Sequence, residues 1–143
     1  RRRCSGKRVM IAIDTNVLVR FLIHHDISPF EVARDIINSG SAKRPAFICQ
    51  KVLVELVWFL ERSCKYSQNE ITAAVMGLVS AAQLQVEIAQ DVAEILPMYQ
   101  NEGFEFSDLM IRQAAIRSGG HHLQTFDHKA AKLSGAALLG ISH

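Results

Sequence analysis

The sequence predicts an α/β fold in which a mainly parallel sheet lies between layers of helices. Short apolar runs alternate along the chain with longer segments of helical periodicity, and the connections between them are short. That order is typical of parallel strands joined through helices. With 143 residues, of which 49% are hydrophobic and 21% charged, the chain is long enough for one globular core. We therefore expect a single domain at residues 10–143.

A basic extension at residues 1–9, RRRCSGKRV, precedes the expected domain. It is either a remnant of a vector or of upstream translation, or a natural arm that contacts phosphate; its lack of periodicity favours the remnant. No apolar run reaches the roughly 20 residues of a membrane span, so we expect a soluble cytoplasmic protein with no membrane partner. The three cysteines form no CxxC pair, which favours free thiols.

The first half of the chain alternates strand and helix signals. The run MIAIDTNVLVRFLI at 10–23 is interrupted by Asp14-Thr15-Asn16, which predicts a strand, a sharp turn and a helix. Ser28-Pro29-Phe30-Glu31 has capping-box spacing with proline at the first helical position, so a helix is expected at 29–39, before Gly40. A short buried strand is expected at 45–49, followed by a helix at 50–63.

The second half continues this alternation. A second capping box, Ser67-Gln68-Asn69-Glu70, opens a helix that runs to about residue 82, and a strand follows at 84–88. We expect Asp91 to cap a helix that Pro97 kinks or shortens, and Ser107 to cap a helix at 108–118. The last expected elements are a strand at 121–126, a short helix at 127–134 and a strand at 136–141.

Four carboxylates fall where this arrangement would bring them to one edge of the sheet. Asp14 and Asp127 follow the ends of two strands, and Asp108 lies in the first turn of a helix, which points back to that edge. Glu55 is the single charge in the apolar run VLVELVWFL. Simpler explanations exist: helix caps for Asp14 and Asp127, a dipole effect or a pair with Arg112 for Asp108, and an exposed position for Glu55.

Taken together, the four acids predict a metal site. A buried Glu55 would need a proton, a cation or a metal, and converging carboxylates repel one another unless a divalent cation neutralises them. Ligands that are all oxygens select Mg2+ or Mn2+ over zinc. Basic residues near the acids could contact the backbone of a nucleic acid, or could simply form solvated helix faces. These residues are Arg20, Arg112, His128, Lys129 and Lys132.

The four acidic segments resemble, in order and context, the motifs of PIN-domain nucleases. The segments are MIAIDTNVLVRFL, VLVELVWFLE, FSDLMIRQAA and LQTFDHKAAKL, and the resemblance spans residues 10–140. It is closest to the small VapC-type toxin ribonucleases of bacterial toxin-antitoxin pairs. The resemblance implies a PIN-like three-layer sandwich and metal-dependent hydrolysis of RNA phosphodiester bonds.

The resemblance also implies roles for individual residues. Asp14, Asp108 and Asp127 would hold the metal directly or through water, and Glu55 would either bind it or position water. Thr125 matches a position where the family has a small hydroxyl residue near the metal. Asn16 matches the turn that shapes the loop around Asp14. All four acids are present, so the resemblance does not suggest an inactive copy.

The function implied is that of an endoribonuclease toxin with a cognate antitoxin as its partner. The helix around Trp58 and Phe59 is apolar on almost every side, which favours a homodimer interface or an antitoxin-binding groove. The alternatives are a housekeeping PIN nuclease that processes RNA and a PIN module that binds RNA or protein without cutting. A haloacid-dehalogenase-like phosphatase is disfavoured because Asn16 stands where its second aspartate is needed, and no Walker loop or GxGxxG motif occurs.

Overall fold

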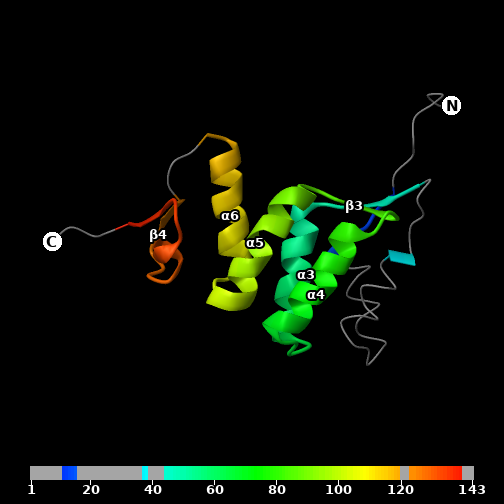
Figure 1. The fold of residues 1–143 in the computed structure, drawn as a ribbon, viewed down its shortest axis with the longest axis horizontal. Helices are drawn as coiled ribbons and strands as arrows, with labels where there is room; N and C mark the ends of the chain where they lie inside the picture. The colour runs from blue at the N-terminus through cyan, green and yellow to red at the C-terminus, as the bar shows by residue number, and fades with distance from the viewer. Residues whose placement is uncertain (1–10, 16–36, 39–43, 120–122, 140–143) are drawn as a thin grey trace. The chain divides into compact units, whose positions relative to one another are not determined.

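The computed structural model describes residues 11–15, 37–38, 44–119 and 123–139 of the chain (Figure 1). The chain divides into two compact units, Arg1–Ala89 and Gln90–His143, which we call unit 1 and unit 2. Each unit combines helices with parallel strands, so the predicted α/β class is confirmed. None of the helices in the described part of the chain is long and apolar enough to cross a membrane.

Unit 1 contains a three-stranded parallel sheet in the order β1-β2-β3. Its strands are β1 (Ile11–Ala12), β2 (Ala46–Ile48) and β3 (Leu84–Val86). Ala46 pairs with Ile11 on one side and with Leu84 on the other, so β2 is the central strand. Ala46 and Ile48 are fully buried, as expected for a central parallel strand.

Two helices of unit 1, α3 (Gln50–Arg62) and α4 (Gln68–Ser80), lie side by side (Figure 1). The residues that α3 buries recur at helical spacing along one face, and α4 buries a matching face. The fully buried side chains of this core include Leu53, Leu56, Leu60, Ile71 and Leu78. The helices predicted at 50–63 and 67–82 are therefore confirmed, with ends one or two residues earlier.

The capping box predicted at the start of α4 is present. The Ser67 hydroxyl accepts the Glu70 N–H at 3.1 Å, and the Glu70 carboxylate accepts the Ser67 N–H at 2.9 Å. These two bonds satisfy backbone donors that the first helical turn leaves without an intrahelical partner. The sequence signal was sufficient here because both partners of the motif are local.

Replacing Ser67 with alanine should therefore destabilise unit 1 by about 1 kcal/mol, the usual cost of losing a side-chain cap. Ser63, the residue that follows α3, is exposed, and its side chain makes no cap. Ser63→Ala should change the free energy of unfolding by less than about 0.5 kcal/mol. Urea denaturation followed by circular dichroism would measure both, and equal effects would contradict the capping argument.

Unit 2 contains helices α5 (Ala89–Glu102) and α6 (Phe106–Arg117) and a two-stranded parallel sheet. The strands are β4 (Leu123–Thr125) and β5 (Ala136–Leu138), with the short 3-10 helix η1 (Ala130–Lys132) between them (Figure 1). The rings of Tyr99 and Phe106 pack edge to face, with centroids 5.6 Å apart.

Two predicted helix caps in unit 2 are wrong. Asp91 lies inside the first turn of α5, where it forms an ion pair with Arg117. Ser107 is the second residue of α6, and the N-cap is Glu105, whose ψ of 140° is extended. Asp and Ser are compatible both with the cap and with the first turn, so sequence alone could not separate the two positions.

Several expected elements fall partly or wholly outside the described residues. The helix predicted at 29–39 is one, although Ile37 and Asn38 are helical. The helix expected after Asn16 and the extension at 1–9 also lie outside. The helix expected at 127–134 is reduced to η1. The expectation of one domain at 10–143 stays a prediction.

Candidate functional site

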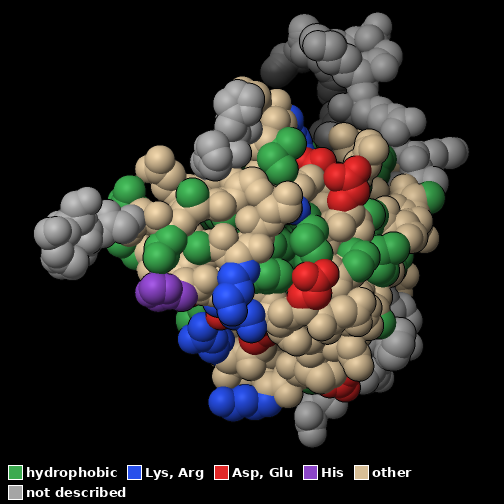
Figure 2. All heavy atoms as spheres, turned by 60° about the vertical axis from the view of Figure 1, so that its left-hand side comes forward, with side chains coloured by type: hydrophobic (Ala, Val, Ile, Leu, Met, Phe, Trp, Pro, Cys, Tyr) green, Lys and Arg blue, Asp and Glu red, His purple; other side chains and the backbone are tan. Residues whose placement is uncertain are grey.

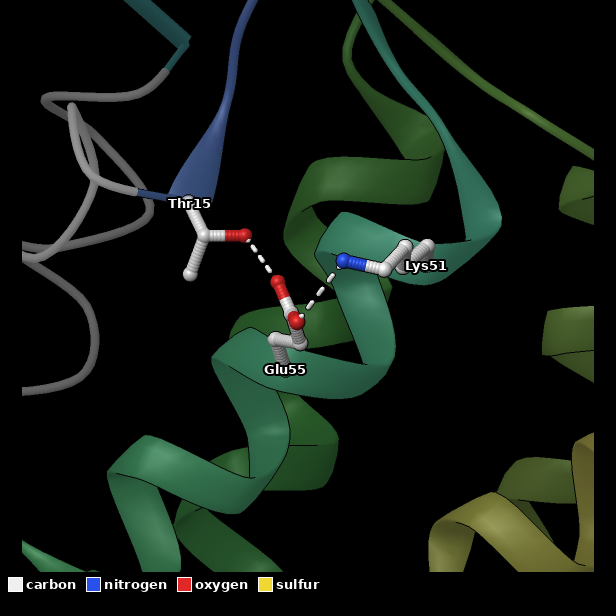
Figure 3. Close-up of polar contacts among 3 residues, drawn as sticks. All are labelled: Thr15, Lys51 and Glu55. Atoms are coloured by element: carbon white, nitrogen blue, oxygen red, sulfur yellow. Dashed lines mark hydrogen bonds and ion pairs between the residues drawn. The ribbon is translucent and has the colours of Figure 1, made fainter.

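Unit 1 brings the turn after β1 to the middle of α3. Asp14 is exposed and follows β1 by two residues, and Thr15 is next in the chain. The Thr15 hydroxyl donates a hydrogen bond to Oε1 of Glu55, although the two residues are 40 positions apart in sequence (Figure 3). The structure thus places Glu55 beside Thr15, the residue that follows Asp14.

The second oxygen of Glu55 is also occupied. Lys51, one helical turn earlier on α3, donates to Oε2 at 3.0 Å (Figure 3). The Thr15 hydroxyl and, after it, the Lys51 ammonium lower the pKa of Glu55, outweighing the opposing effect of desolvation. Glu55 is therefore held in its ionised form.

The expectation that Glu55 is buried is wrong. Its side chain is 41% exposed, while the buried face of α3 is formed by other residues. Its charge is compensated by Lys51 and Thr15, so no metal is needed to explain its presence on an apolar helix. The apolar run around Glu55 does not indicate burial, because Trp58 in the same run is 53% exposed. The cation that Glu55 needs is Lys51, one helical turn earlier.

Replacing Thr15 with valine should raise the pKa of Glu55, because the hydrogen bond from Thr15 is the largest cause of its lowered value. Lys51→Met, which removes a hydrogen bond and a positive charge, should also raise the pKa of Glu55, whereas Thr15→Ser, which keeps the hydroxyl, should leave it unchanged. Carbon-13 NMR titration of the Glu55 carboxyl would measure all three.

The sign of the accompanying stability change follows from linkage. A carboxyl whose pKa is lowered on folding stabilises the protein above its unfolded pKa, and this contribution is lost as the pH falls through the folded pKa. Thr15→Val should therefore reduce stability at neutral pH more than at acidic pH. An unchanged titration of Glu55 in Thr15→Val would contradict the assigned contact.

Unit 2 holds the other two acids. Asp108 lies in the first turn of α6, and Asp127 follows β4 by two residues. Partial burial, then the charge of Asp127 and then that of Glu105 raise the pKa of Asp108. Asp108 is thus close enough to Asp127 for their charges to interact.

Asp127 is held in a compact turn. Its backbone N–H donates to the Thr125 hydroxyl at 3.0 Å, and its Oδ1 accepts the Lys129 N–H at 3.0 Å. The Ala131 N–H donates to the Asp127 carbonyl at 3.0 Å. Asp127 thus forms a local turn and not the helix cap that was its simpler explanation, because the N-cap of η1 is Lys129. Thr125 lies beside Asp127, where the resemblance places a hydroxyl.

The donor set of these residues fits a hard divalent cation, because every donor is a carboxylate or hydroxyl oxygen. In unit 1, Lys51 already occupies Oε2 of Glu55, so a metal ion bound there would have to replace the ammonium group. In unit 2, Asp108 is repelled by two carboxylates that a cation would neutralise. Within either unit, however, the described residues bring together no three His, Cys, Asp or Glu side chains suited to holding a metal ion. A site formed by all four acids stays a prediction.

The basic residues predicted to contact RNA differ in their surroundings. His128, Lys129 and Lys132 are exposed and follow Asp127 closely in the chain. Arg112 is instead 6% exposed and makes its hydrogen bonds within unit 2. Asn16 and Arg20 lie outside the described residues. The RNA contacts of the basic residues and the loop-shaping role of Asn16 stay predictions.

Two charged residues that act on the candidate acids, Lys51 and Glu105, were not predicted from the sequence. The sequence spacing could have indicated both interactions, since Lys51 is four residues before Glu55 and Glu105 is three residues before Asp108. These are the spacings at which side chains meet on a helix, or meet across its N-terminus. The tertiary contact of Thr15 with Glu55 had no such local signal.

Asp14 and Glu55 lie in unit 1, after β1 and on α3, and Asp108 and Asp127 lie in unit 2, in the first turn of α6 and after β4. The family model for the PIN domain matches residues 11–136, so the chain belongs to the PIN domain family. All four acids lie within the matched region.

Among curated proteins, the VapC ribonuclease of Aquifex aeolicus (strain VF5) is 23% identical to this chain over 124 residues. The alignment covers 87% of this chain and 92% of that protein. No solved structure gives a significant match.

Proposed function

We propose that this PIN-domain protein is a metal-dependent endoribonuclease that acts as the toxin of a type II toxin-antitoxin pair. The observation that carries the proposal is the complete set of Asp14, Glu55, Asp108 and Asp127 within the PIN-domain match. The similarity to a protein named VapC ribonuclease, over most of both chains, supports RNA as the substrate.

In this proposal Asp14, Asp108 and Asp127 hold Mg2+ or Mn2+, and Glu55 either joins them or orients the attacking water. When bound, such an ion would supply an activated water and neutralise charge on the phosphate oxygens. Both possible roles of Glu55 require an ionised carboxylate, and the contacts from Thr15 and Lys51 favour that form. Thr125 supports the site by holding the Asp127 turn through its hydroxyl.

Substrate binding is assigned to the exposed basic residues that follow Asp127. His128, Lys129 and Lys132 provide cationic or hydrogen-bonding groups for an RNA backbone next to a proposed metal ligand. Such contacts hold phosphates without reading the base sequence.

We further propose a homodimer in the cytoplasm and an antitoxin as the regulating partner. Large hydrophobic side chains are exposed in both units, and hydrophobic side chains of this kind are visible at the surface in Figure 2. On α3, Trp58 is 53% exposed and lies under the guanidinium of Arg62, 5.4 Å from the ring centroid. Aromatic and arginine side chains are enriched in protein interfaces. A monomeric mass by light scattering would contradict the homodimer.

Incubation of purified protein with total bacterial RNA tests the proposal. We expect discrete fragments with Mg2+ or Mn2+, none with EDTA, and none from the Asp14→Asn variant. Fragment mapping would then give the cleavage site. If wild type and variant both bind RNA or a partner and neither cleaves, the function is that of a binding module. Cleavage that persists in EDTA would contradict the metal dependence.

A further inference from the structure

Arg112 is a buried cation in unit 2 that the proposed chemistry does not use. It lies on α6, one helical turn after Asp108, and is 6% exposed. Its Nη1 donates to the backbone carbonyl of Ser134 at 3.1 Å, and its Nη2 donates to Oε1 of Gln113 at 3.1 Å. Nη2 also lies 3.9 Å from Sδ of Met98 on α5. A guanidinium in these surroundings is poorly placed to contact an RNA backbone.

The burial of this charge is costly, because its compensation is indirect. Among the described residues Arg112 makes no ion pair, and its Nε has no hydrogen-bond partner. The nearest compensation runs through Gln113, whose Nε2 donates to Glu94 on α5 at 3.2 Å. An apolar side chain of similar volume would avoid the cost of burying a charge. What Arg112 adds at this position is its pair of hydrogen bonds, to Ser134 and to Gln113.

The bond to Ser134 reaches the segment that carries Asp127. Three successive backbone hydrogen bonds span residues 127–133. The N–H groups of Ala131, Lys132 and Leu133 donate to the carbonyls of Asp127, Lys129 and Ala130, at 3.0, 3.0 and 3.1 Å. Ser134 follows this hydrogen-bonded segment directly. A constraint at the Ser134 carbonyl is therefore transmitted through a stiff turn to Asp127.

We propose that Arg112 is a positioning residue that fixes the segment 127–134 against α6 and so sets the separation of Asp108 from Asp127. Asp108 and Arg112 share α6, and Asp127 and Ser134 share the hydrogen-bonded turn, so one bond joins the two elements that carry the acids. The inference is about geometry within unit 2. It rests on the proposed function only in giving that separation a role in metal binding.

The first test measures the geometry without a metal. Spin labels at Ile111 and Lys132, both exposed, would report the distance between α6 and η1 in a protein with Cys4, Cys49 and Cys64 replaced by serine. We expect a narrow distance distribution in the otherwise wild-type protein and a clearly broader one in Arg112→Met. Val92→Ala, which truncates a fully buried side chain on α5, is the control for general destabilisation and should leave the distribution narrow.

The second test measures the consequence for the acids. Electron paramagnetic resonance titration with Mn2+ should show binding weakened by about tenfold in Arg112→Met, the scale seen when residues that orient metal ligands are replaced. Val92→Ala should bind as the wild type does. Arg112→Lys keeps the charge but lacks the planar fork needed for both bonds at once, so it should show smaller changes in both measurements.

The outcomes separate this inference from the proposed function. If wild-type protein binds no Mn2+, the metal-dependent function fails, while the distance measurement still decides the role of Arg112. A distribution as narrow in Arg112→Met as in wild type, or equally broad in Val92→Ala, would overturn the positioning role. Should Arg112→Met fail to fold, Arg112→Lys decides, and a wild-type distribution in that variant overturns the inference.

Discussion

Replacing Asp108 with asparagine should reduce RNA cleavage by at least about 100-fold. The proposal makes Asp108 a residue that holds the metal, and even residues that only orient ligands contribute about 10- to 100-fold to metal affinity or activity. Its surroundings support this role, since partial burial and the charges of Asp127 and Glu105 all disfavour the ionised form unless a cation is present. The initial rate of cleavage of a labelled RNA, in saturating Mg2+ or Mn2+, would measure the loss.

Glu105→Gln is the matched control. It removes the same charge three residues away, from the N-cap of α6, where the side chain makes no capping hydrogen bond. Glu105 is exposed, so its screened charge should change the rate by less than about threefold. Equal losses in the two variants would indicate a general electrostatic effect. An active Asp108→Asn variant would remove Asp108 from the proposed site.

The stability of Asp108→Asn gives an independent check that lost activity is not lost folding. The pKa of Asp108 is raised in the folded protein. A carboxyl with a raised folded pKa contributes most to stability below its unfolded pKa, and the contribution disappears as the pH rises through the folded pKa. At neutral pH the charged side chain therefore opposes folding. At neutral pH the Asp108→Asn variant should therefore unfold at the same temperature as the wild type or at a slightly higher one, as expected for a site that trades stability for function.

The sequence was sufficient for elements whose signals are local. The strand around Ala46, the capping box at Ser67 and the apolar face of α3 each depend on residues within a few positions of one another. The ends of α5 and α6 were less predictable. There the side chains of Asp91 and Ser107 suit both a cap and a first turn, and in α6 the extended ψ of Glu105 makes that residue the cap.

The site was predictable in composition but not in its surroundings. The positions of Asp108 and Asp127 follow from the element order, because helix starts and parallel strand ends meet at one edge. The burial of Arg112 and the exposure of Glu55 do not follow from it. Both depend on which side of a helix faces its tertiary neighbours, and the polar partners involved, Ser134 and Thr15, are 22 and 40 residues away in sequence.

A pair of leucine truncations should show whether residues 10–143 unfold as one domain. Leu53 on α3 is fully buried in unit 1, and Leu96 on α5 is 1% exposed in unit 2. Replacing either with alanine removes the same atoms from a packed core, which costs about 2–5 kcal/mol. If the prediction of a single domain is correct, each variant lowers the urea midpoint of one shared transition.

Trp58 makes this experiment specific, because it is the single tryptophan of the chain and lies in unit 1. Its fluorescence reports the unfolding of unit 1, whereas circular dichroism at helical wavelengths reports both units. For one cooperative domain, Leu96→Ala must shift the fluorescence transition as far as the dichroism transition, although the mutation is in unit 2. A Leu96→Ala variant whose Trp58 transition stays at the wild-type midpoint, while its dichroism shows an earlier step, would mean that the units fold separately. The four acids would then lie on two separately folding parts, and metal binding would have to join them.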